Sequence, residues 1–180
     1  MTNLNKIERI ISIDPGINKT GFAVLESMGR QIRTLAYGTI EPPNKNYTPD
    51  RLKFLNSELS KILTKFKPSH MAIEDMYYGK NVKSALTLGQ ARGVLILAAA
   101  ENGIPCSEYA PRKVKQSVVG NGNADKDQVK YMVKQILKIE SIKGSNDISD
   151  ALAVGICHFN QNKYICCLLY TSDAADDSYR

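Results

Sequence analysis

Two short apolar segments on either side of a long amphipathic helix constrain the fold of this chain most strongly. Ile10–Ile13 is rich in β-branched residues, which indicates a buried strand ending at Asp14. Thr48–Pro68 has a hydroxyl cap and proline at its start, leucines at helical spacing and a second proline at its end. Residues 70–74 form the second apolar segment. Because a helical crossover separates the two predicted strands, we expect them to be parallel.

The remaining segments predict an α/β fold. Two further strands, at 21–25 and 32–40, should form an antiparallel meander with the first strand. A long helix rich in small residues is expected over 81–101, a last strand over 105–109, and helical segments from Pro111, Ala124 and Asn146. We therefore expect a mixed sheet of about five strands, the first three antiparallel, flanked by helices.

The length of 180 residues fits one domain, which we place at residues 1–163. From Tyr164 onward, neither a helical stripe nor a turn pattern joins the chain to the rest. Residues 164–180 resemble translated vector or adapter sequence, and we leave them out of the functional argument.

Composition favours a cytoplasmic protein with a polyanionic partner. The formal net charge is +6, and no apolar run is long enough for a secretion signal or a membrane span. The four cysteines show neither Cys-x-x-Cys spacing nor a histidine partner at zinc spacing, so we interpret them as reduced structural thiols.

Four carboxylates stand where a catalytic site is expected. Asp14 and Glu74 each end an apolar strand, and neighbouring parallel strands end at the same sheet edge. Asp147 and Asp150 are three residues apart at the start of a helix, so they share one helical face. Separately, these residues are explained as a turn residue, a surface acid or a helix-dipole partner.

Together the four acids predict a metal site. Two carboxylates about 4 Å apart repel by roughly 4 kcal/mol at an effective dielectric near 20, so such a cluster needs cations or protons. Oxygen ligands without histidine or cysteine suit Mg²⁺ or Mn²⁺ rather than zinc. Two such ions per site would serve phosphodiester hydrolysis.

Five motifs then give a family resemblance. Segments 13–21 (IDPGINKTG), 72–75 (AIED), 79–94 (GKNVKSALTLGQARGV), 114–122 (VKQSVVGNG) and 150–153 (DALA) resemble the RuvC family of Holliday-junction resolvases, in order, between Ile10 and His158. The resemblance implies a ribonuclease-H-like fold and Mg²⁺-dependent endonuclease activity, with Asp14, Glu74, Asp147 and Asp150 as catalytic acids. It also implies a homodimer and partnership with the RuvA–RuvB branch-migration complex. The sequence departs from the family at its C-terminal end, which puts DNA contacts there in doubt.

Several basic and aromatic residues are candidates for DNA contact. Tyr77 resembles the family's junction-core aromatic and could stack on opened bases, with Lys80 beside it, although a tyrosine there could equally pack into the core. Lys115 and Lys126 fall where the family has phosphate-contacting lysines, with Arg112 nearby. A stripe of lysines from Lys126 to Lys138 is also explained as a solvated helix face.

Small residues on the 81–101 helix bear on assembly. Ala85, Gly89 and Gly93 are four apart and would let a second helix approach, but packing on the chain's own sheet explains them equally well. The two-fold symmetry of a four-way junction favours a C2 dimer. The alternative functions are an actin-like or sugar-kinase ATPase, another ribonuclease-H-like nuclease, and a non-catalytic junction-binding module.

Overall fold

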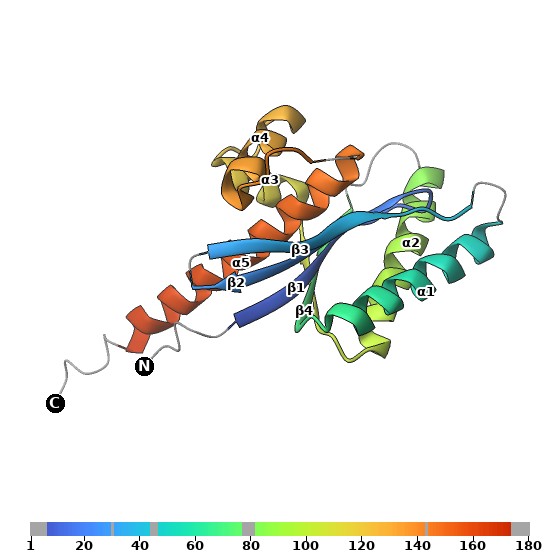
Figure 1. Ribbon diagram of the computed structural model, residues 1–180, viewed down its shortest axis with the longest axis horizontal. Helices are drawn as coiled ribbons and strands as arrows, with labels where there is room; N and C mark the ends of the chain where they lie inside the picture. The colour runs from blue at the N-terminus through green and yellow to red at the C-terminus, as the bar shows by residue number, and fades with distance from the viewer. Residues whose placement is uncertain (1–6, 30, 44–46, 77–81, 143, 174–180) are drawn as a thin grey trace.

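The computed structural model describes residues 7–29, 31–43, 47–76, 82–142 and 144–173, with the side chains of the last helix described as far as Gln161. Five strands form one sheet in the order β3-β2-β1-β4-β5 (Figure 1). The strands are β1 Ile7–Asp14, β2 Thr20–Met28, β3 Gln31–Ile40, β4 His70–Glu74 and β5 Cys106–Tyr109. The helices are α1 Thr48–Phe66, α2 Val82–Glu101, α3 Pro111–Val119, α4 Lys126–Leu137 and α5 Asn146–Asp173.

The strand directions confirm the predicted topology. β1 pairs with β2, and β2 with β3, in antiparallel ladders. β1 pairs with β4, and β4 with β5, in parallel ladders. Helix α1 provides the crossover between the meander and β4. Leu55, Leu59 and Leu63 are its buried stripe, and Lys67 ends it in the left-handed conformation just before Pro68.

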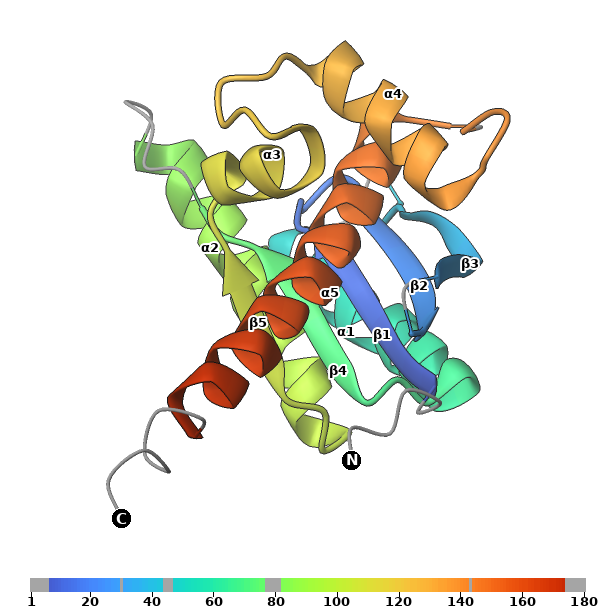
Figure 2. The same ribbon diagram turned by 90° about the vertical axis from the view of Figure 1, so that its left-hand side faces the viewer.

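Helices cover both faces of the sheet, so the molecule has three layers with two apolar cores. One core lies between the sheet and helices α1 and α2, and includes Ile11, Leu59 and Leu95. The other lies between the sheet and helices α3, α4 and α5, and includes Val133 and Leu152. Figure 2 shows α5 crossing the sheet obliquely, which brings its first turn to one end of β1.

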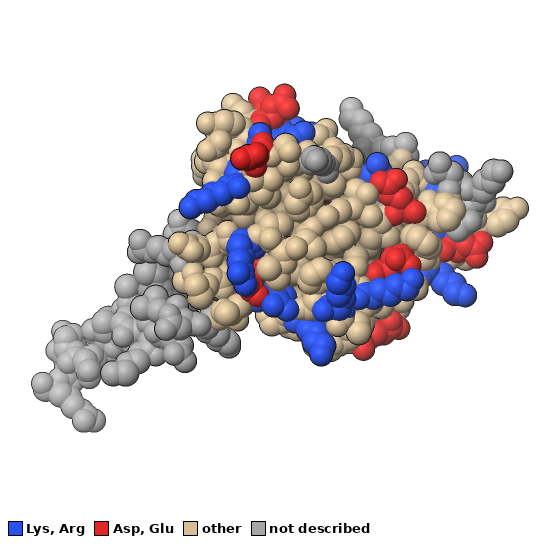
Figure 3. Space-filling model, viewed as in Figure 1, with Lys and Arg blue, Asp and Glu red and all other residues tan. Residues whose placement is uncertain are grey.

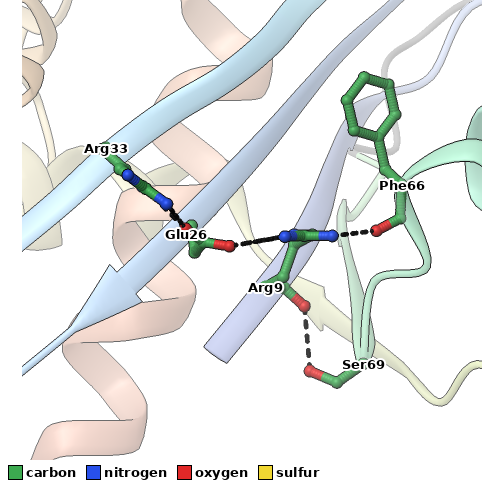
Figure 4. A network of polar contacts seen from close by, with 5 residues as sticks. All are labelled: Arg9, Glu26, Arg33, Phe66 and Ser69. Carbon is green, nitrogen blue, oxygen red and sulfur yellow. Dashed lines mark hydrogen bonds and ion pairs between the residues drawn. The ribbon is translucent and has the colours of Figure 1, made fainter. Parts of the chain in front are cut away.

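The opposite end of the sheet is held by a buried carboxylate. Glu26 on β2 accepts hydrogen bonds from Arg9 on β1, at 2.8 Å, and from Arg33 on β3 (Figure 4). Arg9 also donates to the carbonyl oxygen of Phe66 at the end of α1, at 2.7 Å. This network links three strands and a helix. The four candidate acids are expected at the other end of the sheet.

Helix α5 continues to Asp173, so no break in the helix marks the proposed boundary after residue 163. That boundary, and the foreign origin of the tail, therefore stay predictions. Among the helical residues that the structure describes, no segment is long and apolar enough to cross a membrane.

Candidate active site

Asp14 and Glu74 lie side by side at one edge of the sheet. β1 and β4 are parallel neighbours, and their last paired residues are Ile13 and Ile73. The next residue of each strand is the acid, and the side chains of Asp14 and Glu74 are hydrogen-bonded to each other. The sequence prediction that both acids share one sheet edge is confirmed.

Gly21 allows the start of helix α5 to reach this edge. Gly21 on β2 is paired with Asp14 across the antiparallel ladder. A Cβ atom at Gly21 would lie 2.1 Å from the carbonyl oxygen of Asp147, so any larger residue would collide with the helix. Gly155 has the same role two turns later, because a Cβ there would lie 2.4 Å from Leu25. Gly21 belongs to a predicted strand and to a family motif, but neither pattern predicts this contact, because the contact joins segments far apart in the sequence.

The electrostatics of Asp14 show that all four acids are close together. Burial and the charges of Glu74, Asp150 and Asp147 together raise the pKa of Asp14 to about 8. Burial also raises the pKa of Glu74, with a contribution from Asp150. Because neither Asp14 nor Glu74 readily holds a full negative charge beside the other, a proton held between them stabilises the pair.

Two lysines partly compensate these charges. The Nζ atom of Lys126 lies 3.4 Å from Oδ2 of Asp150. Burial raises the pKa of Asp150, whereas Lys126 and Lys115 lower it. Lys126 is the first residue of α4, and Asp125 caps that helix through a reciprocal capping box with Gln128. The cap fixes the helix start from which Lys126 reaches the acids.

The donor set fits a hard divalent cation, although the side chains do not enclose one as they lie. Within the described residues, no three His, Cys, Asp or Glu side chains form a group arranged to hold a metal. Asp14 is instead hydrogen-bonded to Glu74, and Asp150 is paired with Lys126. Carboxylate oxygens crowded to this degree are ligands for Mg²⁺ or Mn²⁺, which would take over the role of the shared proton and the lysine.

The predicted DNA contacts are only partly described. Tyr77 and Lys80 lie outside the described residues. Lys115 on α3 is half-buried and close enough for its charge to affect Glu74 and Asp150, whereas Arg112 is exposed at the start of α3 and packs against Gly122. The face in Figure 3 shows basic and acidic side chains interspersed, so the net charge of +6 does not form an unbroken basic surface there.

The small residues of α2, from which a dimer was predicted, face two different surroundings. A Cβ atom at Gly93 would meet none of the described atoms within 4 Å, so this position is open in the part of the chain that the structure describes. Gly89 instead faces the side chain of Met76 of the same chain, where a Cβ would lie 3.7 Å from the sulfur. Val82, Leu86 and Leu97 are large apolar residues of this helix that are more than half exposed. Gly89 thus packs against the protein's own chain, whereas Gly93 lies on a face of α2 that no described residue covers.

The sequence matches the family described as "Crossover junction endodeoxyribonuclease RuvC" over residues 10–158. The protein of that name from Proteus mirabilis is 49% identical over 155 residues, covering 85% of this chain and 88% of the relative. Its namesake from Ruminiclostridium cellulolyticum is 46% identical over 154 residues, covering 86% and 93%.

Solved structures agree with the sequence match. "T. thermophilus RuvC in complex with Holliday junction substrate" superposes with a TM-score of 0.83 at 28% identity, covering 87% of this chain and 96% of that one. The yeast mitochondrial Holliday junction resolvase Ydc2 superposes with a TM-score of 0.61 at 12% identity, which shows a shared fold alone. The ribonuclease-H-like fold predicted from the sequence is confirmed. With a match to nearly the whole described domain, this chain belongs to the crossover junction endodeoxyribonuclease RuvC family.

Proposed function

We propose that this protein is an endodeoxyribonuclease that resolves four-way DNA junctions by paired symmetric nicks, in recombination and repair. The observation that carries the proposal is the convergence of acids from β4 and α5 on Asp14 of β1. Burial and the charges of these acids together raise the pKa of Asp14 to about 8. The names of the relatives and the junction bound to the Thermus thermophilus protein support the substrate. An actin-like ATPase finds no such support.

Membership of this nuclease family implies dependence on a divalent metal ion. We propose Mg²⁺, two ions per site, with Mn²⁺ able to substitute, held by Asp14, Glu74, Asp147 and Asp150. Bound ions would favour ionisation of the attacking water and neutralise charge on the leaving oxygen. On metal binding, Asp14 and Glu74 would give up the proton between them to solvent. Lys126, now paired with Asp150, would turn towards a DNA phosphate.

The proposal includes five DNA-binding residues, from α3, α4 and the segment after β4. Lys115 and Lys126 would contact phosphates close to the scissile bond, since both already act electrostatically on Glu74. Arg112, exposed at the start of α3, would contact the DNA backbone. Tyr77 and Lys80, in the segment after β4, would act where the strands separate at the branch point. Phosphate contacts of this kind would give salt-sensitive affinity with little sequence information.

We further propose that the protein acts as a homodimer through the open face of α2. Among the described residues nothing crowds Gly93, and Leu86 and Leu97 are exposed on the same helix, which suits close approach of a second copy. A C2 dimer would present two active sites related by the symmetry of a four-way junction. Partnership with RuvA–RuvB and action in the cytoplasm, where bacterial chromosomal DNA lies, complete the proposal.

The direct test is incubation of the purified protein with a synthetic mobile four-way junction and Mg²⁺. We expect nicks at symmetric positions in two opposing strands, and no nicks in the matched linear duplex or in EDTA. Equal cleavage of junction and duplex would instead indicate another ribonuclease-H-like nuclease. Tight junction binding without any nick in Mg²⁺ or Mn²⁺ would indicate a non-catalytic binding module.

A further inference from the structure

A partly buried arginine on α2 bridges two acids behind the active site. The side chain of Arg92 is only 16% exposed, and its Nη2 atom lies 3.5 Å from Oδ1 of Asp75. The same nitrogen donates a hydrogen bond to Oε2 of Glu108 on β5. The Nε atom of Arg92 is buried without a hydrogen-bond partner in the described part of the chain. These two carboxylates are therefore the main polar anchors of the guanidinium group.

Asp75 is the residue that directly follows Glu74 at the exit of β4. Its backbone N–H donates to the carbonyl oxygen of Tyr109 at 2.8 Å, which extends the β4–β5 pairing by one step. Its Oδ1 atom accepts a hydrogen bond of 2.7 Å from the backbone N–H of Met76. One carboxylate oxygen thus meets both the turn that leaves β4 and Arg92 of helix α2.

The position of Glu74 depends on how the chain is held where it leaves β4. The carboxylate of Glu74 lies beside Asp14 of the neighbouring strand. One peptide bond joins Glu74 to Asp75, whose backbone N–H is fixed by its hydrogen bond to Tyr109. Without the guanidinium, the acids Asp75 and Glu108 would face each other with no cation between them, and like charges separate. A shift at Asp75 would pass directly to Glu74, and small misplacements of a catalytic group are costly.

We propose that Arg92 is a positioning residue for the nuclease reaction, which fixes the exit of β4 through Asp75 and so aims Glu74 at Asp14. This inference rests on the proposed catalytic role of Glu74. Arg92 acts through Asp75 and contacts neither DNA nor the metal. Glu108 serves as the second anchor that keeps the guanidinium in place.

The test compares Arg92→Gln, Arg92→Lys and Asp75→Asn by steady-state junction cleavage and by thermal unfolding. We expect Arg92→Gln and Asp75→Asn to lower kcat by between about ten- and a hundredfold, with KM changed less than about twofold. Arg92→Lys should recover part of kcat, because a cation remains. The double variant Arg92→Gln/Asp75→Asn should be no slower than the slower single variant, since both changes break one link. Lys61→Gln, which breaks the exposed pair with Glu58, is the control and should keep wild-type rates.

Two outcomes would overturn the proposal. One is a wild-type kcat for Asp75→Asn, a nearly isosteric change at a half-exposed side chain that should fold whatever happens to Arg92→Gln. The other is additive losses in the double variant. Glu74→Gln separates this inference from the active site itself. An inactive Glu74→Gln beside a fully active Asp75→Asn refutes only the positioning role, whereas an active Glu74→Gln refutes the proposed catalytic acids.

Discussion

Gly21 and Asp147 are in contact although they come from opposite ends of the chain, and a Cβ atom at Gly21 would lie 2.1 Å from the Asp147 carbonyl oxygen. Gly21 is also the ladder partner of Asp14. Because Gly21 has no side chain, the first turn of α5 can lie beside the end of β1. The convergence of the late acids on Asp14 depends on this contact.

Gly21→Ala should therefore move the start of α5 and separate the acids. We expect a loss of about 1–3 kcal/mol in the free energy of unfolding, as for other overpacked contacts. Cleavage of junctions by the folded fraction should fall much more than junction affinity does. Urea unfolding and single-turnover cleavage measure the two effects. Gly93→Ala is the control, because the added methyl group meets no described residue. Equal free energies of unfolding for Gly21→Ala and Gly93→Ala would contradict the close contact between Gly21 and Asp147.

Gly93→Leu tests the proposed dimer face without disturbing the chain's own packing. Because a Cβ at Gly93 would lie more than 4 Å from every described residue outside its own helix turn, the variant should fold normally. A leucine there should block close approach of a second α2 and shift the protein to monomer in sedimentation equilibrium. The monomer should lose paired nicking. Lys61→Leu on α1 controls for the added apolar surface, and a Gly93→Leu protein that stays dimeric would place the interface elsewhere.

Lys115→Ala should weaken junction binding through the loss of one phosphate contact. We expect the magnitude of the negative slope of log affinity against log salt concentration to fall by about one unit. The loss of affinity should be similar on junctions of different sequence. Fluorescence anisotropy across a salt series measures this slope. Lys61→Ala is the matched lysine control on the exposed part of α1. A slope equal to that of the wild type would remove Lys115 from the DNA interface.

A buried histidine predicts loss of stability in mild acid. The ring of His158 stacks on His70 with centroids 4.6 Å apart, and its Nδ1 is hydrogen-bonded to the hydroxyl of Tyr109. Burial, with the nearby His70, lowers the pKa of His158 from 6.5 to about 4. The unfolded chain therefore binds this proton first, so its contribution to stability is complete above pH 6.5 and is lost as the pH falls towards 4.

The loss from His158 should reach roughly 3 kcal/mol by pH 4. Chemical denaturation between pH 7 and 4 measures it as a difference, because the free energy of unfolding of the wild type should fall by this amount relative to that of His158→Gln. Asp14, whose raised pKa changes stability in the opposite direction over this range, is present in both proteins and cancels in the comparison. Identical curves for wild type and His158→Gln would show that the histidine is not held neutral by the fold.

Local patterns predicted much of this architecture and the first half of the site. The β-branched segment before Asp14, the leucine stripe of α1 and the proline after it were sufficient to predict parallel strands that end in Asp14 and Glu74. The strand order follows from short connections and the crossover rule. Each of these inferences used residues that are near one another in the sequence.

The contacts that complete the site could not be predicted in this way, because they join distant segments. The pairing of Lys126 with Asp150, 24 positions apart, depends on how α4 packs on α5. The approach of Asp147 to Gly21 depends on the angle at which α5 crosses the sheet. Neither angle nor packing leaves a periodic signal in the sequence. Arg92 was noted only within a family motif, and its acidic partners became visible with the fold.

The central proposal is that four carboxylates, gathered on Asp14, make this protein cleave junctions with divalent metal. The most direct measurement compares Asp14→Asn with the wild type for both binding and cleavage of one four-way junction in Mg²⁺. We expect junction affinity to stay within about threefold, since asparagine removes a charge and leaves the fold and the lysines in place, while cleavage disappears. Wild-type cleavage by Asp14→Asn would contradict the proposed site.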